Sequence, residues 1–220
     1  MTPETLHATQ PPIQLRSSRS RQGSTEVTVP SEEQIAALRE QFESQHCVYL
    51  PKLLSEEVLG RLLPDIARAD FTDETNRVLA AHSTMRPNAA GALLLFLVND
   101  QRLFEVVRRI TDCERIGHFA GRVYRMAPSA SVPWHDDLVN YRIIAMSINL
   151  SPEPFKGGSL QLRAAPSGEL LHEAHHAEPG DAIVFRLADY LHHRVTTVEG
   201  TRPRIAFAGW FKSGADAFSR

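Results

Sequence analysis

The stretch RIAFAGWF, residues 204–211, is the last of a series of short apolar stretches that begins near Gly117. Pro and Gly turns separate these stretches, and about eight of them recur at strand length. The earlier ones are GRVYRM (121–126), SVPWHDDL (131–138), RIIAMSINL (142–150), SLQLR (159–163), ELLHEAHH (169–176), DAIVFRL (181–187) and LHHRVTTV (191–198). Short strands at this spacing predict an antiparallel barrel or a jelly roll.

The first half of the chain carries the signals of helices instead. Ser31 forms a capping box with the Gln three residues later, so the first helix is expected to begin there. A second helix is expected to begin at Ser55 and to kink or end at Pro64. Asn99 or Asp100 caps a third helix, whose apolar residues recur at helical spacing. Helices are therefore expected to precede the strands.

These patterns divide the chain into a tail and one domain. Residues 1–29 are rich in Thr, Gln, Pro, Ser and Arg and have little to bury, which predicts a disordered tail. Residues 30–220 are expected to form a single domain, with a helical lead-in over 30–115 and a strand core over 116–213. Residues 71–90 show no clear period, and we expect a loop there.

Length and composition limit the classes of function. The chain has 220 residues and a formal net charge of −2, so no basic surface indicates a nucleic-acid partner. The longest apolar run, residues 92–98, is too short to cross a bilayer, and no membrane partner is expected. The two cysteines, Cys47 and Cys113, cannot form a disulfide framework and are expected to be reduced, which favours a cytoplasmic location.

The stretch PWHDDL, residues 133–138, contains three side chains that can bind a metal. If it is extended, His135 and Asp137 share one face and Asp136 points to the other. With one more imidazole, His135 and Asp137 would complete a facial triad of two His and one carboxylate, which suits non-haem Fe(II) oxygenases. A His-x-Asp pair alone is a weak signal, because it also occurs at exposed strand ends.

Further motifs follow in a fixed order, and together they resemble the Fe(II)- and 2-oxoglutarate-dependent dioxygenases, in particular the branch similar to prolyl hydroxylases. The resemblance covers about residues 117–211. The motifs that carry it are Tyr124, the His-x-Asp at 135–137, SINLSPEPFKGGSLQLR (147–163), EPGDAIVF (178–185) and YLHHRVTTVEGTRPRIAFAGWF (190–211). The resemblance implies a double-stranded β-helix, a jelly-roll or cupin-like barrel within an α+β, mainly β chain, with N-terminal helices packed outside it.

The resemblance also implies which residues form the site. With His135 and Asp137, the family's His-x-Val pattern makes His193 the third metal ligand. Strand alternation agrees, since it turns the alternative, His192, away from the ligand face.

The family also uses a basic residue on the last strand to bind the distal carboxylate of 2-oxoglutarate. Its aromatic residue follows six positions later, which selects Arg204 over Arg202 because Trp210 is six after Arg204. Tyr124 matches a tyrosine that helps to hold the same carboxylate, and an ordinary strand aromatic is the alternative.

The implied activity is oxygenation that uses Fe(II) as its cofactor and consumes 2-oxoglutarate and O2, with ascorbate as a candidate reductant. A small molecule or a protein side chain would be hydroxylated, with release of succinate and CO2. Two alternatives are a barrel that binds a ligand without turnover and a zinc peptidase with His172 and His176 as ligands in a His-Glu-x-x-His pattern. The peptidase pattern needs a helix, whereas Pro and Gly enclose this segment and its residues alternate as in a strand.

Overall fold

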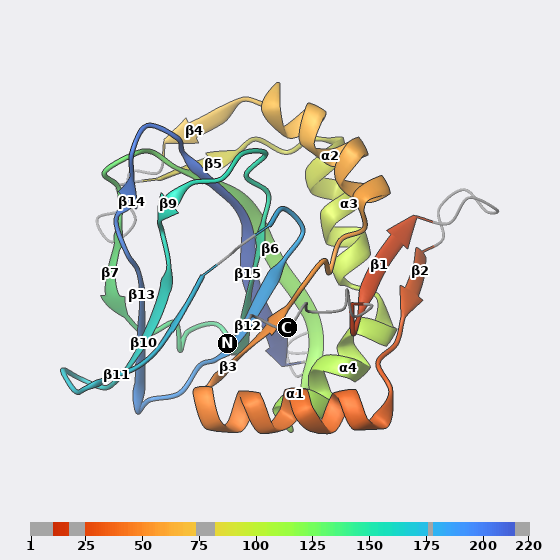
Figure 1. Ribbon diagram of the computed structural model, residues 1–220, viewed down its shortest axis with the longest axis vertical. Coiled ribbons are helices and arrows are strands. Elements are labelled where there is room, and N and C mark those ends of the chain that lie inside the picture. The colour runs from red at the N-terminus through yellow and green to blue at the C-terminus, as the bar shows by residue number, and fades with distance from the viewer. Residues whose placement is uncertain (1–10, 18–24, 74–81, 176–177, 214–220) are drawn as a thin grey trace, which may run out of the picture.

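The computed structural model of the protein describes residues 11–17, 25–73, 82–175 and 178–213. Its centre is a jelly roll of two antiparallel sheets that face each other (Figure 1). The larger sheet has the strand order β3-β12-β8-β15-β6-β5-β4, and the smaller has the order β11-β10-β13-β7. The predicted fold is thereby confirmed.

From β6 onward, the chain passes back and forth between the two sheets. The strands of the larger sheet are β3 (Cys47–Leu50), β4 (Phe71–Asp73), β5 (His82–Met85), β6 (Ile116–Met126), β8 (Arg142–Asn149), β12 (Ala182–Arg186) and β15 (Arg204–Ser213). Those of the smaller sheet are β7 (Val132–His135), β10 (Leu160–Ala164), β11 (Leu170–Ala174) and β13 (Leu191–Val195). Two short strands, β9 (Lys156–Gly157) and β14 (Val198–Glu199), pair with each other.

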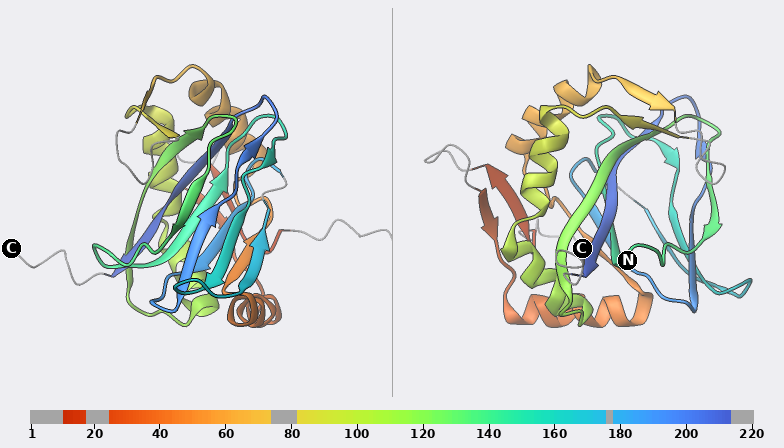
Figure 2. Two further views of the ribbon diagram at one scale, coloured as in Figure 1. Left: turned by 90° about the vertical axis from the view of Figure 1, so that its left-hand side faces the viewer. Right: turned by 180° about the vertical axis from the view of Figure 1, so that it is seen from behind.

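Four helices cover the larger sheet on the side away from the smaller sheet (Figures 1 and 2). They are α1 (Glu32–Gln45), α2 (Glu56–Ala67), α3 (Ala89–Val98) and α4 (Gln101–Thr111). Their caps are Ser31, Ser55, Asn88 and Asp100. Three of these are predicted positions; α2, however, continues past Pro64 to Ala67. Among the described residues, no helix is both long and apolar enough to cross a membrane.

Aromatic rings join the helices to the outer face of the larger sheet. Phe104 of α4 packs edge-on against Phe211 of β15, with ring centroids 5.7 Å apart. Phe211 in turn contacts Phe119 of β6 at 4.9 Å. The main hydrophobic core therefore lies between the helices and this sheet, and it leaves the opposite face of the sheet for the space between the two sheets.

Part of the segment expected to be a disordered tail is ordered. Strands β1 (Gln14–Ser17) and β2 (Thr25–Thr28) form a hairpin, which lies beside the helices in Figure 1. Ile13 and Leu15 are fully buried, and the backbone N–H of Leu15 donates to the carbonyl of Leu53 at 2.7 Å. Polar contacts add to this docking, since the hydroxyl of Thr25 donates to Asp100 at 2.6 Å. Residues 1–10 and 18–24 of the expected tail lie outside the described residues.

The expectation of a loop over residues 71–90 is also wrong for the part that the structure describes. This part contains β4, β5 and the beginning of α3, while residues 74–81 lie outside the described residues. The four residues of β5 are all buried, because the helical core covers one face of the strand and the other faces the space between the sheets. The sequence did not indicate β5, because its cavity-facing residues are polar and the strand therefore lacks an apolar alternation.

Candidate active site

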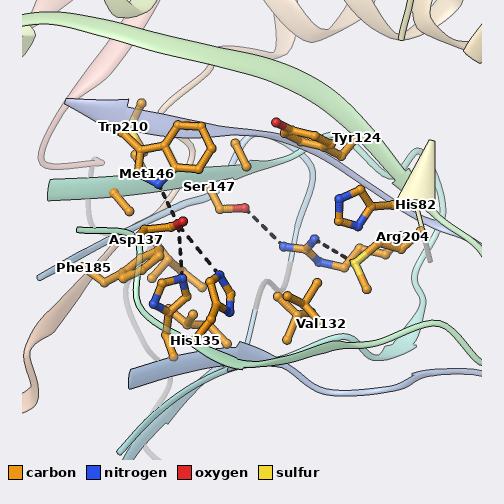
Figure 3. Close-up of a pocket in the computed structure, with 18 residues that line it drawn as sticks. His82, Tyr124, Val132, His135, Asp137, Met146, Ser147, Phe185, Arg204 and Trp210 are labelled. Carbon is orange, nitrogen blue, oxygen red and sulfur yellow. Dashed lines mark hydrogen bonds and ion pairs between the residues drawn. The ribbon is translucent and has the colours of Figure 1, made fainter. Parts of the chain in front are cut away.

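The cavity between the two sheets holds a cluster of three metal-competent side chains. His135 ends β7, His193 lies in the middle of β13, and the two residues are paired directly across these strands. Their rings are 4.2 Å apart, and one donor atom each of His135, Asp137 and His193 lies within 4.8 Å of the others. Figure 3 shows His135 and Asp137 directed toward each other at one end of the cavity.

Asp137 reaches this cluster by a turn and not by strand alternation. Strand β7 already ends at His135, so the expectation of an extended segment through Asp137 is wrong. The carboxylate of Asp136 accepts a hydrogen bond from the backbone N–H of Leu138 at 3.2 Å, which closes a turn, and Asp136 is exposed. Asp136 points away from the cluster as expected, but the turn causes this and not the alternation of a strand.

A backbone contact orients the ring of His135. Its Nδ1 lies 2.8 Å from the carbonyl oxygen of Pro133. Because a carbonyl can only accept, Nδ1 donates this hydrogen bond, and in the neutral ring the lone pair is on Nε2. That Nε2 lies 3.8 Å from Oδ2 of Asp137, which is also an acceptor. Two acceptors that face each other are complementary to a cation, so this donor set fits a divalent metal ion.

Asp137 is held as a carboxylate by neighbours outside the cluster. The indole N–H of Trp210 donates to Oδ2 and the guanidinium of Arg142 to Oδ1, both at 2.8 Å. Arg142 also lies over the Trp210 ring, 3.5 Å from its centroid. Burial raises the pKa of Asp137, but His193, Trp210 and His135 outweigh it, and the pKa lies below its ordinary value.

His193 is the most deeply buried of the three side chains, at 8% exposed. Burial lowers its pKa and outweighs the opposing effect of Asp137, which favours the neutral imidazole. A neutral imidazole and an ionised carboxylate are the forms in which these residues bind metals.

At the opposite end of the cavity lies a buried cation, the guanidinium of Arg204. Its Nη2 donates to the hydroxyl of Ser147 at 3.2 Å, and its Nη1 lies 3.7 Å from the sulfur of Met126. Its Nε has no hydrogen-bond partner, and within the described part of the chain no carboxylate forms an ion pair with it. Burial lowers the pKa of Arg204 to about 10. A buried charge without a counter-ion is costly, so this end of the cavity is complementary to an anion.

The remaining walls are mainly apolar, with two further polar rings near Arg204. The cavity measures about 120 Å³, and Val132, Leu160 and Phe185 are among its lining residues. Tyr124 of β6 and His82 of β5 also line it, beside Arg204 (Figure 3). Their rings meet edge to face, with centroids 5.2 Å apart. A polar pair inside an apolar cavity favours a ligand that is polar at this end.

The residues weighed as alternatives lie elsewhere. His192 and Arg202 do not line the cavity, and Arg202 forms an ion pair with Glu153 at the surface. His172 is on strand β11, so the helix that a zinc peptidase needs is absent at residues 170–174 and the predicted strand is confirmed there. His176 lies outside the described residues.

Two residues that line the cavity and one that contacts Asp137 escaped the sequence reasoning. Arg142 stands at the first position of β8, five residues after Asp137, and that short spacing was the signal that could have linked them. Ser147 is part of the site because its hydroxyl accepts a hydrogen bond from Arg204. The two strands are neighbours in the sheet, but the two residues are far apart in sequence. His82 lies in the segment expected to be a loop and carried no signal.

Comparisons with known proteins agree with this geometry. Residues 121–212 match the family described as the 2OG-Fe(II) oxygenase superfamily. No curated protein matches the sequence. Among solved structures, a prolyl-4-hydroxylase from Pseudomonas putida is 18% identical, with a TM-score of 0.61, over 81% of this chain and 98% of its own.

Two further solved structures of similar fold are enzymes with different activities. A prolyl hydroxylase from Trichoplax adhaerens, in complex with a hypoxia-inducible-factor peptide, is 12% identical with a TM-score of 0.61, over 86% of this chain and 94% of its own. The nogalamycin epimerase SnoN, in complex with Fe³⁺ and α-ketoglutarate, is 10% identical with a TM-score of 0.59, over 83% of this chain and 85% of its own. At these identities the likeness establishes the fold.

The matched residues include the whole smaller sheet, strands β8, β12 and most of β15 of the larger sheet, the three-donor cluster and the buried arginine. This match assigns residues 121–212, which carry the three-donor cluster, to the 2OG-Fe(II) oxygenase superfamily, whose name states the cofactors Fe(II) and 2-oxoglutarate.

Proposed function

We propose that this protein is a 2-oxoglutarate-dependent hydroxylase in which His135, Asp137 and His193 hold Fe(II). Arg204 would bind the distal carboxylate of 2-oxoglutarate, and Tyr124 would assist it. Bound Fe(II) would supply the chemistry of oxidative decarboxylation, which releases succinate and CO2 and leads to hydroxylation of the substrate.

The observation that carries this proposal is that one cavity holds a metal-competent cluster at one end and a buried guanidinium at the other. At one end, His135, Asp137 and His193 each bring a possible ligand atom to within 4.8 Å of the others. At the other end, Arg204 is a buried cation without an acidic partner among the described residues. A metal ion at the first end and a dicarboxylic keto acid reaching the second would satisfy both.

The protein's own residues would orient the cofactors and exclude water. Trp210 and Arg142 hold the two carboxylate oxygens of Asp137, so this side chain is oriented before a metal binds. The guanidinium of Arg204 is planar and can donate two parallel hydrogen bonds to a carboxylate. Apolar walls such as Val132 and Leu160 keep water from the space between the two ends.

We propose that the substrate meets the segment that follows Asp137. Leu138, Val139 and Tyr141 are all large, apolar and exposed, and the ion pair of Asp137 with Arg142 closes the base of this segment. Tyr141 adopts a left-handed backbone with φ of 61°, which is uncommon for an aromatic residue. An apolar part of a small molecule or of a peptide fits this surface, and the two prolyl hydroxylases of similar fold favour a peptide.

We also propose a cytoplasmic location. Cys47 and Cys113 are both free thiols, and burial raises the pKa of Cys47 to about 12, which makes it unreactive. Reduced cysteines are the rule in the cytosol. Fractionation with a tagged chain in its native host would test the location.

The test of the function is an anaerobic titration of the protein with Fe(II) and 2-oxoglutarate, followed by the visible charge-transfer band of the chelated complex. We expect a band in the wild type and in His192→Ala, and none in His193→Ala. No band in the wild type would reject the oxygenase function. A band without succinate after O2 is admitted, with candidate substrates present, would favour the alternative of a protein that binds its ligands without turnover.

A further inference from the structure

His82 stands in one row with Arg204 across the larger sheet. In the register of these strands, His82 of β5 pairs with Met126 of β6, and Met126 pairs with Arg204 of β15. Residues directly opposite one another in antiparallel strands point to the same face of the sheet. His82 and Arg204 are two strands apart, a backbone separation of about 10 Å, and both side chains are directed into the same cavity (Figure 3).

The surroundings of His82 distinguish it from a core histidine on the helical side. Its neighbour on the other face of β5, Met85, belongs to the core beneath the helices, whereas His82 lines the cavity at 9% exposure. Tyr124 packs edge to face against the His82 ring at 5.2 Å, which holds the ring beside the guanidinium. Arg204, Tyr124 and His82 thus surround the anion-complementary end of the cavity from three neighbouring strands.

We propose that His82 donates a hydrogen bond from its ring to the distal carboxylate of 2-oxoglutarate, opposite the guanidinium of Arg204. This inference rests on the proposed function. A carboxylate offers about four lone-pair sites on its two oxygens, more than the two that one guanidinium fork fills. In an apolar cavity every remaining site needs a donor from the protein. The nearby polar groups that can serve are the hydroxyl of Tyr124, the hydroxyl of Ser147 and the ring of His82.

The experiment compares two keto acids that chelate iron through the same end. 2-Oxoglutarate carries the distal carboxylate, and 2-oxobutyrate lacks it. Each is titrated anaerobically into the Fe(II) protein, and the charge-transfer band gives its dissociation constant without turnover. The variants are His82→Phe, which keeps an aromatic ring, and His82→Gln, which keeps a donor. Ser83→Ala is the control, because Ser83 is the next residue of β5 and is likewise buried.

We expect His82→Phe to bind 2-oxoglutarate about tenfold more weakly, the usual effect of one charge-assisted hydrogen bond, and to bind 2-oxobutyrate as the wild type does. We expect His82→Gln to recover part of the loss and Ser83→Ala to show none. An unchanged ratio of the two dissociation constants in His82→Phe would overturn the inference, whether neither affinity changes or both decrease equally. If the wild type shows no band with either acid, the proposed function itself has failed.

Discussion

The two ends of the cavity are built in opposite ways. At the proposed metal end, His135, Asp137 and His193 support one another, and Trp210 and Arg142 hold the carboxylate from outside. At the other end, the hydrogen-bond partners of Arg204 among the described residues are a hydroxyl and a sulfur. The first end is therefore preorganised before its ion arrives, whereas the second carries an unpaired charge that a ligand would neutralise. Removing a residue should therefore have different consequences at the two ends.

The largest effect is expected at the metal end. Asp137→Ala should abolish Fe(II) binding at concentrations that saturate the wild type, because even partners of metal ligands contribute about 10- to 100-fold in affinity. Asp136→Ala is the matched control, since Asp136 is exposed and only closes the turn. Calorimetric titration with Mn(II) in place of Fe(II) measures both. Equal metal affinity of the two variants would contradict the assignment.

Arg204→Met should separate binding from stability. We expect 2-oxoglutarate to bind about 100-fold more weakly, because one partner of a buried charge pair is lost. The free energy of unfolding without ligands should stay equal or increase, since an unpaired buried charge is removed. Fe(II) affinity should not change. Arg202→Met, at the surface, should change none of these quantities. A clear loss of stability in Arg204→Met, measured by urea denaturation, would contradict this comparison.

Trp210→Phe should weaken the metal end by a smaller amount. The variant removes the indole N–H that donates to Asp137 but keeps an aromatic ring beneath Arg142. We expect Fe(II) affinity to decrease by about tenfold. The affinity for 2-oxobutyrate relative to that for 2-oxoglutarate should remain as in the wild type. A change in that ratio would mean that the two ends are coupled through β15.

The smallest effect is expected for Gly158→Ala, which acts on the other end. Gly158 has φ of 63°, and an added Cβ would lie 2.8 Å from Cδ of Arg204. The strained backbone should cost about 1–2 kcal/mol in the free energy of unfolding. The displaced arginine should weaken 2-oxoglutarate binding a few-fold while leaving Fe(II) binding unchanged. Gly200→Ala is a useful control, because it has the same left-handed backbone but no atom near the added Cβ. Equal 2-oxoglutarate affinity in both variants would show that the contact with Arg204 is unimportant.

The elements that were predicted well are those with a strong local signal. The capping box at Ser31, the cap at Asp100 and the apolar strands from residue 121 onward each depend on neighbouring residues alone, and the structure contains all of them. The hairpin of β1 and β2 and strand β5 were missed, because they are ordered by contacts with distant parts of the chain. Ile13 and Leu15 show this most clearly, since only their burial against the helices distinguishes them from a polar tail.

By itself, the sequence determined the succession of helices and strands, the choice of His135, Asp137, His193 and Arg204 as candidates, and the family they indicate. These inferences rest on residue type and order and, for His193 and Arg204, on the resemblance of their motifs to the family's pattern. Only the tertiary structure decided that a turn brings Asp137 to the histidines, that Trp210 and Arg142 hold it, and that His82 stands beside Arg204. The physical reason is that pairing of strands distant in sequence creates these contacts, and no local pattern records which distant residue will be opposite.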